Sequence, residues 1–306
     1  MGDGKAADSR LLLPRRLPAI SPASTRGGRC TSTASTAHHA GPSQDTNKDT
    51  SQVTNPQIIA MGGGGFSSRP KTPALDEYIL RQCPKRTPRV CFLPTASGDA
   101  DEYIVRFYAS FSKFACRPTH ASLFRLPAAL RQYLLAQDII YVGGGNTRSM
   151  LALWREWKVH EILREAWQRG IILSGVSSGG ICWFEEGLVD SLPGQLTPLQ
   201  CLGFLKGSFC PHYNTEPARR PEYLKLIRAA KMRPGLAVED GVAVHFIGHR
   251  LAHVVSVRRG PVTYAIRLTK GGLEEETLQV KSLAPSETQE STREAAKPGT
   301  DSPAQR

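Results

Sequence analysis

The chain has 306 residues, a formal net charge of +12 and 40% hydrophobic residues. Its lysines and arginines are scattered, without a basic helix or an aromatic-interleaved RNA-binding motif, so we interpret the charge as solvated surface and expect no nucleic-acid partner. No run reaches the roughly 18 apolar residues of a membrane helix, so no membrane span is expected.

The two ends of the chain differ in composition from its middle. Residues 1–54 are rich in Ser, Thr, Ala, Pro and Arg, and residues 270–306 in Glu, Lys, Ser, Thr and Pro, which predicts a disordered N-terminal extension and a disordered C-terminal tail. Residues 55–269 are then expected to form one α/β domain. The seven cysteines contain no C-x-x-C pair, which favours a reducing, cytoplasmic location and no metal site. The Arg- and Ser-rich start leaves a mitochondrial transit peptide as the alternative.

Apolar strands alternate with helical segments through the first half of the domain. Strands are expected at 57–61, 89–93, 121–124, 138–142 and from 171, and helices at 72–80, 99–114, 128–136, 148–157 and 160–168. This alternation predicts an α/β fold with a doubly wound, mostly parallel sheet and with ligands at the carboxyl ends of its strands.

The pattern changes after residue 190. Residues 193–207 are interpreted as loop, and residues 220–231 as a helix. The segments 236–247, 250–257 and 262–268 alternate in the manner of a terminal antiparallel hairpin and strand.

A glycine run at 62–65 follows the first strand. It lacks the complete dinucleotide-binding spacing, a following Gly-Lys-Ser/Thr and an acid placed for a ribose, so no nucleotide and no cofactor is predicted. We interpret the run as a loop that lines a cleft at the edge of the sheet.

The stretch with the clearest chemistry is Gly175-x-Ser177-x-Gly179, between a buried strand and a helix start. This is the frame of a nucleophile elbow, in which flanking glycines allow the sharp bend that exposes the hydroxyl. A serine needs a base, and among the eight histidines His212 stands out because it lies in a loop after a short apolar run.

Four motifs together resemble the peptidase E family of serine peptidases, which includes aspartyl dipeptidase and, more distantly, cyanophycinase. The motifs are Tyr141-Val-Gly-Gly-Gly-Asn-Thr147, Gly175-Val-Ser-Ser-Gly-Gly-Ile-Cys-Trp-Phe184, Cys210-Pro-His-Tyr213 and Val238-Glu-Asp-Gly241. The resemblance runs from about residue 58 to residue 268 and implies a Rossmann-like sheet akin to class I glutamine amidotransferases.

The resemblance also implies roles for individual residues. Ser177 would be the nucleophile and His212 the general base, with Glu239 preferred to Asp190 as the acid that completes the triad. Backbone N–H groups of Gly145 and Ser178 would form the oxyanion hole. The chain departs from the family at Ser178, where the usual motif has Ala.

The substrate is expected to be a small peptide, with neither a cofactor nor a metal. Selection of an N-terminal Asp needs a cation, for which Arg219 and Arg220 are the candidates. The chain could be a monomer or a homodimer. Two alternatives stay open: an esterase of the α/β-hydrolase type, with the order Ser, acid, His, and a non-catalytic binding protein on the same fold.

Overall fold

The computed structural model describes residues 55–68, 72–125, 128–260 and 262–283. Its larger sheet has eight strands in the order β14-β11-β10-β1-β5-β4-β2-β3. These strands are β1 (Gln57–Gly63), β2 (Arg89–Leu93), β3 (Arg117–His120), β4 (Ile139–Val142), β5 (Ile172–Val176), β10 (Val242–Ile247), β11 (Arg250–Ser256) and β14 (Lys281–Ser282). Within this sheet the five neighbouring strands β1, β5, β4, β2 and β3 pair in parallel. The predicted doubly wound, mostly parallel sheet is therefore confirmed.

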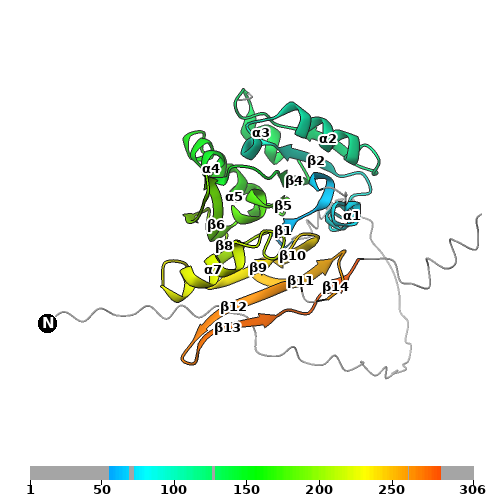
Figure 1. The fold of residues 1–306 in the computed structure, drawn as a ribbon. Coiled ribbons are helices and arrows are strands. Elements are labelled where there is room, and N and C mark those ends of the chain that lie inside the picture. The colour runs from blue at the N-terminus through cyan, green and yellow to red at the C-terminus, as the bar shows by residue number, and fades with distance from the viewer. Residues whose placement is uncertain (1–54, 69–71, 126–127, 261, 284–306) are drawn as a thin grey trace, which may run out of the picture.

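Helices cover both faces of this sheet (Figure 1). Successive residues of β1 alternate between two apolar clusters, with Ile58 and Ala60 in one and Ile59 and Met61 in the other, because neighbouring strand residues point to opposite faces. Helices α3 (Leu130–Leu135), α4 (Thr147–Glu156) and α5 (Val159–Gln168) contribute to the first cluster, and α1 (Pro73–Arg81) and α2 (Asp101–Phe111) to the second. The alternating strands and helices thus bury the sheet from both sides.

A second sheet combines strands within two segments that the sequence analysis predicted to be strands, 236–247 and 262–268, with strands that it did not predict. It has the order β13-β12-β9-β8-β6-β7 and packs against helix α7 (Arg219–Arg228). Its strands are β6 (Phe184–Leu192), β7 (Gln195–Gln200), β8 (Leu205–Cys210), β9 (Gly235–Val238), β12 (Thr263–Thr269) and β13 (Gly272–Thr277). The loop assignment for 193–207 was wrong because β7 is an edge strand whose polar, partly exposed residues show little apolar alternation.

Two further boundaries differ from the prediction. The strand expected at 121–124 is β3, at Arg117–His120, which pairs with β2. The tail expected from residue 270 begins with β13, whose glutamates pair across β12 at the exposed edge of the sheet, so its acidic composition gave no apolar signal.

The remaining predictions concern the two ends of the chain, the terminal hairpin and membrane spans. The extension predicted over 1–54 and the tail from 284 lie outside the described residues. The hairpin predicted near the end of the domain is confirmed, since β10 and β11 pair in antiparallel. None of the helices described in the structure is long and apolar enough to cross a membrane.

Candidate active site

The nucleophile elbow is built between β5 and the short helix α6 (Ser178–Ile181). Ser177 occupies the turn with φ 54° and ψ −113°, a strained conformation for a residue with a side chain. The flanking glycines serve close approach rather than the bend, because a Cβ on Gly175 would lie 2.3 Å from the carbonyl oxygen of Gly179. The strand and the helix therefore pack tightly while the strain falls on the serine.

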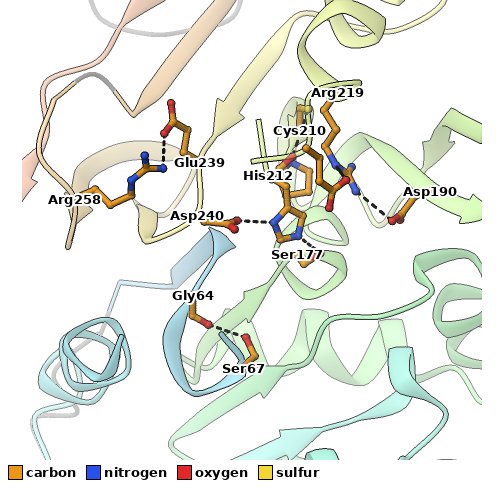
Figure 2. Close-up of polar contacts among 12 residues, drawn as sticks. Gly64, Ser67, Ser177, Asp190, Cys210, His212, Arg219, Glu239, Asp240 and Arg258 are labelled. Atoms are coloured by element: carbon orange, nitrogen blue, oxygen red, sulfur yellow. Dashed lines mark hydrogen bonds and ion pairs between the residues drawn. The ribbon is translucent and has the colours of Figure 1, made fainter. Parts of the chain in front are cut away.

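Three side chains form a continuous line of hydrogen bonds at this turn (Figure 2). His212 Nε2 lies 2.8 Å from Ser177 Oγ, and His212 Nδ1 lies 2.5 Å from Asp240 Oδ1. An ionised carboxylate only accepts hydrogen bonds, so Nδ1 carries a proton, and whenever the ring is neutral Nε2 is left as the acceptor for the hydroxyl. This arrangement can take the proton from Ser177.

The histidine and the aspartate come from the second sheet, while the serine comes from the first. His212 follows β8 with φ 52°, and Asp240 follows β9. Gly63, at the end of β1, bridges to Asp240, and a Cβ on Gly63 would lie 2.0 Å from Asp240 Oδ1 and 3.0 Å from His212 Cε1. The two sheets meet at this glycine, next to the hydrogen-bonded set of Ser177, His212 and Asp240, which we call the proposed relay.

The surroundings of Asp240 favour its ionised form. Burial raises the pKa of this carboxyl, but hydrogen bonds from His212 and Thr215, with the positive charges of His212 and Arg258, outweigh it and lower the pKa below its usual value. The carboxylate is therefore charged at neutral pH and can hold the imidazole in one tautomer and stabilise the imidazolium that forms during proton transfer.

Glu239, the preferred third member in the sequence analysis, does not contact His212. Its carboxylate accepts a hydrogen bond from the Asn214 side-chain amide. It also accepts one from Arg258 at 2.7 Å (Figure 2). Its backbone N–H pairs with Val262, so Glu239 continues the strand, and its side chain points away from that of the next residue. The prediction was off by one residue, because strand alternation gives the two acids opposite directions.

Asp190, the alternative acid, also lies away from the imidazole. Its carboxylate is 3.4 Å from the guanidinium of Arg219. The sequence did contain a signal for Asp240: the Asp-Gly pair at 240–241 is typical of a turn, and Gly241 has φ +80°. An acid at a turn after a strand has more freedom to face a cleft than an acid within the strand.

Both proposed oxyanion donors lie beside the nucleophile. A Cβ on Gly144, the residue before Gly145, would lie 3.4 Å from Ser177 Cβ, and Ser178 is the first residue of α6. Neither the Gly145 N–H nor the Ser178 N–H donates a hydrogen bond within the part of the chain that the structure describes. These two groups are thus free to donate to an oxygen bound at Ser177.

The two arginines predicted to bind substrate are both engaged elsewhere. Arg219 is 1% exposed, and its guanidinium binds Glu216 at 2.5 Å and the carbonyl oxygen of Leu188 at 3.0 Å. Arg220 pairs with Glu275 at 2.8 Å. The expectation that they supply a cation to the cleft is therefore corrected: Arg219 is buried among its own partners, and Arg220 pairs with a glutamate of β13.

No cluster of three or more His, Cys, Asp or Glu side chains within the described ranges is arranged to hold a metal ion. The chemistry that the site can perform with its own groups is proton transfer by His212 and nucleophilic attack by Ser177.

Comparisons with known proteins agree with this geometry. A serine, a histidine and an aspartate in hydrogen-bonded sequence, with free backbone donors beside the serine, are typical of a serine hydrolase. The family model of peptidase family S51 matches residues 58–254, and the chain belongs to that family and is a serine-type peptidase.

Individual relatives support the same assignment. The chain is 52% identical over 228 residues to the uncharacterized peptidase YgaJ of Bacillus subtilis (strain 168). The matched region covers 74% of this chain and 99% of that protein. A peptidase from an acI-B1 actinobacterium has a similar fold, with a TM-score of 0.54 at 16% identity over 74% of this chain and 96% of that one. A structure described as a peptidase E protein from Listeria monocytogenes EGD-e gives a TM-score of 0.50 at 16% identity over 67% of this chain and 100% of its own.

Proposed function

We propose that this serine peptidase hydrolyses short peptides with Ser177 as nucleophile, His212 as general base and Asp240 as the acid that orients the histidine. The observation that carries the proposal is the unbroken line from Ser177 Oγ through the imidazole to Asp240 Oδ1, with distances of 2.8 Å and 2.5 Å.

In the proposed acylation step, His212 Nε2 takes the Ser177 proton while Oγ attacks the peptide carbonyl carbon. The carbonyl oxygen becomes an oxyanion and accepts hydrogen bonds from the N–H groups of Gly145 and Ser178, each worth a factor of roughly 100 to 1,000 in rate. The imidazolium then gives its proton to the leaving amine, and the C–N bond breaks to leave an acyl ester on Ser177. A water molecule, deprotonated by the same imidazole, attacks the ester and regenerates the serine.

The order of these residues argues against the esterase alternative. In α/β-hydrolases the acid precedes the histidine, whereas here the acid that contacts His212 is Asp240, which follows it. A non-catalytic protein on this fold is disfavoured because the nucleophile, base, acid and both backbone donors are present together.

A short substrate is supported by the elements around the nucleophile. The end of β6 contacts two neighbouring parts of the chain: Asn146 donates to the Ser191 carbonyl oxygen at 3.0 Å, and Asp190 pairs with Arg219 at the start of α7. We propose that this end of β6, tied to the loop that carries Gly145, restricts the length of a bound peptide. With Arg219 and Arg220 engaged, the proposed preference for an N-terminal Asp has no assigned cation and is tested directly below.

The cellular location proposed is the cytoplasm. The six cysteines in the described part of the chain are all free, as is usual in a reducing compartment.

The proposal is tested by intact-protein mass spectrometry after treatment with a fluorophosphonate probe. The parent protein should gain one adduct, Ser178→Ala should also gain one, and Ser177→Ala should gain none. A parent that stays unlabelled beside a labelled control hydrolase, and that cleaves no peptide, would overturn the proposal.

The substrate class is tested with a library of dipeptides and longer peptides. We expect cleavage of dipeptides and little cleavage of chains beyond a few residues. Asp-initiated members are compared with the matching Asn-initiated ones, because the pair differs only in side-chain charge. Equal rates for both would remove the acidic preference but keep the peptidase assignment.

A further inference from the structure

The loop that carries Gly145 is held on both sides of its proposed donor. The Gly144 N–H donates to the Tyr103 hydroxyl at 3.2 Å, and the Asn146 N–H donates to the Ala96 carbonyl oxygen at 2.7 Å. Between these two anchored amides lies the peptide group that joins Gly144 to Gly145, and its N–H has no partner in the described structure. The proposed donor is therefore presented by a peptide whose neighbours are fixed.

The peptide group that joins Gly145 to Asn146 is also held by the side chain of Ser178, the residue after the proposed nucleophile. The Ser178 hydroxyl donates to the Gly145 carbonyl oxygen at 2.5 Å, and Ser178 is only 2% exposed. The peptide group between Gly145 and Asn146 is thus held at its oxygen by Ser178 and at its N–H by Ala96. This peptide group shares the Gly145 Cα with the neighbouring peptide group that carries the Gly145 N–H, so its fixed orientation limits how far that N–H can turn.

The glycine itself cannot supply this restraint. Gly145 has φ +140°, and a Cβ there would lie 2.2 Å from the Ala96 carbonyl oxygen, so only glycine fits the loop. Glycine is also the residue with the greatest backbone freedom, and a loop of three glycines at 143–145 needs outside contacts to hold one conformation.

We infer that the Ser178 side chain is a positioning residue for the oxyanion hole, which holds the Gly145 N–H in register with the N–H of Ser178 itself. This inference rests on the proposed function. A Ser at this position, where the usual family motif has Ala, thus couples the two donors: one residue gives its backbone N–H to the oxyanion and its hydroxyl to the loop that carries the other N–H.

The inference predicts an effect confined to the transition state. Ser178→Ala removes one hydrogen bond to a neutral carbonyl, and we expect kcat to fall about tenfold with KM within about twofold, since the oxyanion exists only after attack. A peptide aldehyde, which forms an oxyanion on Ser177, should bind about tenfold more weakly. The same peptide with a CH2–NH group in place of the scissile amide, which has no such oxygen, should bind as before.

Ser208→Ala is the matched control. Ser208 is another buried serine, whose hydroxyl hydrogen-bonds to Tyr223 and to the Arg233 carbonyl oxygen at 2.6 Å each, away from the loop. It should lower Tm without changing the ratio of aldehyde to reduced-peptide affinity. A Ser178→Ala variant with unchanged kcat and aldehyde affinity, or with both ligands weakened equally, would overturn the inference. Failure of the parent protein to react with the aldehyde and the fluorophosphonate would instead overturn the proposed function and, with it, the inference.

Discussion

Glu239 and Asp240 are adjacent in sequence, but their carboxylates have different partners. Burial raises the pKa of Glu239, whereas the contacts with His212 lower that of Asp240 despite its burial. Only Asp240 can fix the tautomer of the imidazole, because only it reaches Nδ1. We therefore expect substitutions of Asp240 to affect activity and substitutions of Glu239 to affect mainly stability.

Asp240→Asn should lower kcat by roughly 1,000- to 10,000-fold, because a neutral amide neither fixes the tautomer of His212 nor stabilises the imidazolium. Glu239→Gln should keep kcat within about tenfold while lowering Tm, since it weakens the ion pair of the buried Glu239 carboxylate with the partly exposed Arg258. Steady-state kinetics and thermal unfolding of both variants check this. A loss of activity in Glu239→Gln as large as that in Asp240→Asn would contradict the assignment.

Asp76 is a buried carboxyl outside the proposed relay. It lies in α1 beneath the turn η1 (Gly65–Ser67), its Oδ1 is 3.4 Å from the Tyr141 hydroxyl, and its Oδ2 has no partner within the described residues. Burial raises its pKa to about 7, against the opposing hydrogen bonds from Tyr141 and the Phe66 backbone. The folded protein therefore holds a proton on Asp76 at pH values where the unfolded chain has lost it.

Stability should consequently fall as pH rises from about 4 to about 7, because across this window the folded state binds the extra proton. Asp76→Asn removes this dependence. We expect its free energy of unfolding, relative to the parent, to increase by roughly 3 kcal/mol between pH 4 and pH 8. Urea unfolding at a series of pH values measures the difference.

Asp138→Asn provides the contrast of opposite sign. Hydrogen bonds from the Arg89 backbone and from Lys85, with their charges, lower the pKa of Asp138 despite its partial burial. Its contribution is present above the unfolded pKa and is lost as pH falls, so this variant should lose most stability at neutral pH. For Asp76, the opposite result would be a free energy of unfolding that depends on pH in the same way in Asp76→Asn and in the parent. That result would exclude a proton on the buried carboxyl.

At the scale of the elements, the strand ends decide where the chemistry lies. β5 ends directly before Ser177, β8 and β9 each end two residues before His212 and Asp240, and β1 ends at Gly63 beside Asp240. The carboxyl ends of parallel strands gather at one edge of a sheet, which is why segments far apart in sequence meet here.

Gly63→Ala should disrupt the site, because Gly63 lies at the end of β1 next to Asp240. A Cβ would fall within 2.0 Å of Asp240 Oδ1, so the carboxylate must move away from His212. We expect kcat/KM to fall at least about 100-fold, as for a displaced triad member. Gly271→Ala is the control, because its Cβ would meet only Thr269 Oγ1 at 3.7 Å. Circular dichroism should show that both variants fold; full activity in Gly63→Ala would contradict the role given to this glycine.

The parallel half of the fold and two members of the proposed relay were predictable from sequence, and the second sheet was predictable only in part, at β9 and β12. The buried strand β4 is a continuous apolar run, and the glycine frame marks Ser177. Strand β13 carries glutamates on an exposed edge, which resemble a solvated tail. The choice between Glu239 and Asp240 depends on where β9 ends, a boundary that composition does not define to one residue.

At the scale of the whole molecule, the described residues from 55 to 283 contain every group in the proposed mechanism. A fragment of residues 55–283 should therefore keep kcat/KM within about twofold of the full chain. EDTA should leave the kcat/KM of both proteins unchanged, because no proposed step uses a metal. Kinetics with and without the chelator test both expectations. A drop above tenfold on truncation would assign a catalytic role to the removed segments.

The origin of the relay in two sheets has a consequence for the newly made chain. Ser177 follows a strand of one sheet, and its base and acid follow strands of the other, so the three groups meet only after both sheets have formed and docked at Gly63. Peptidase activity should then appear last during refolding, after the far-ultraviolet signal of secondary structure is complete. A half-folded copy, in which the two sheets have not yet docked, should therefore be inactive as a peptidase.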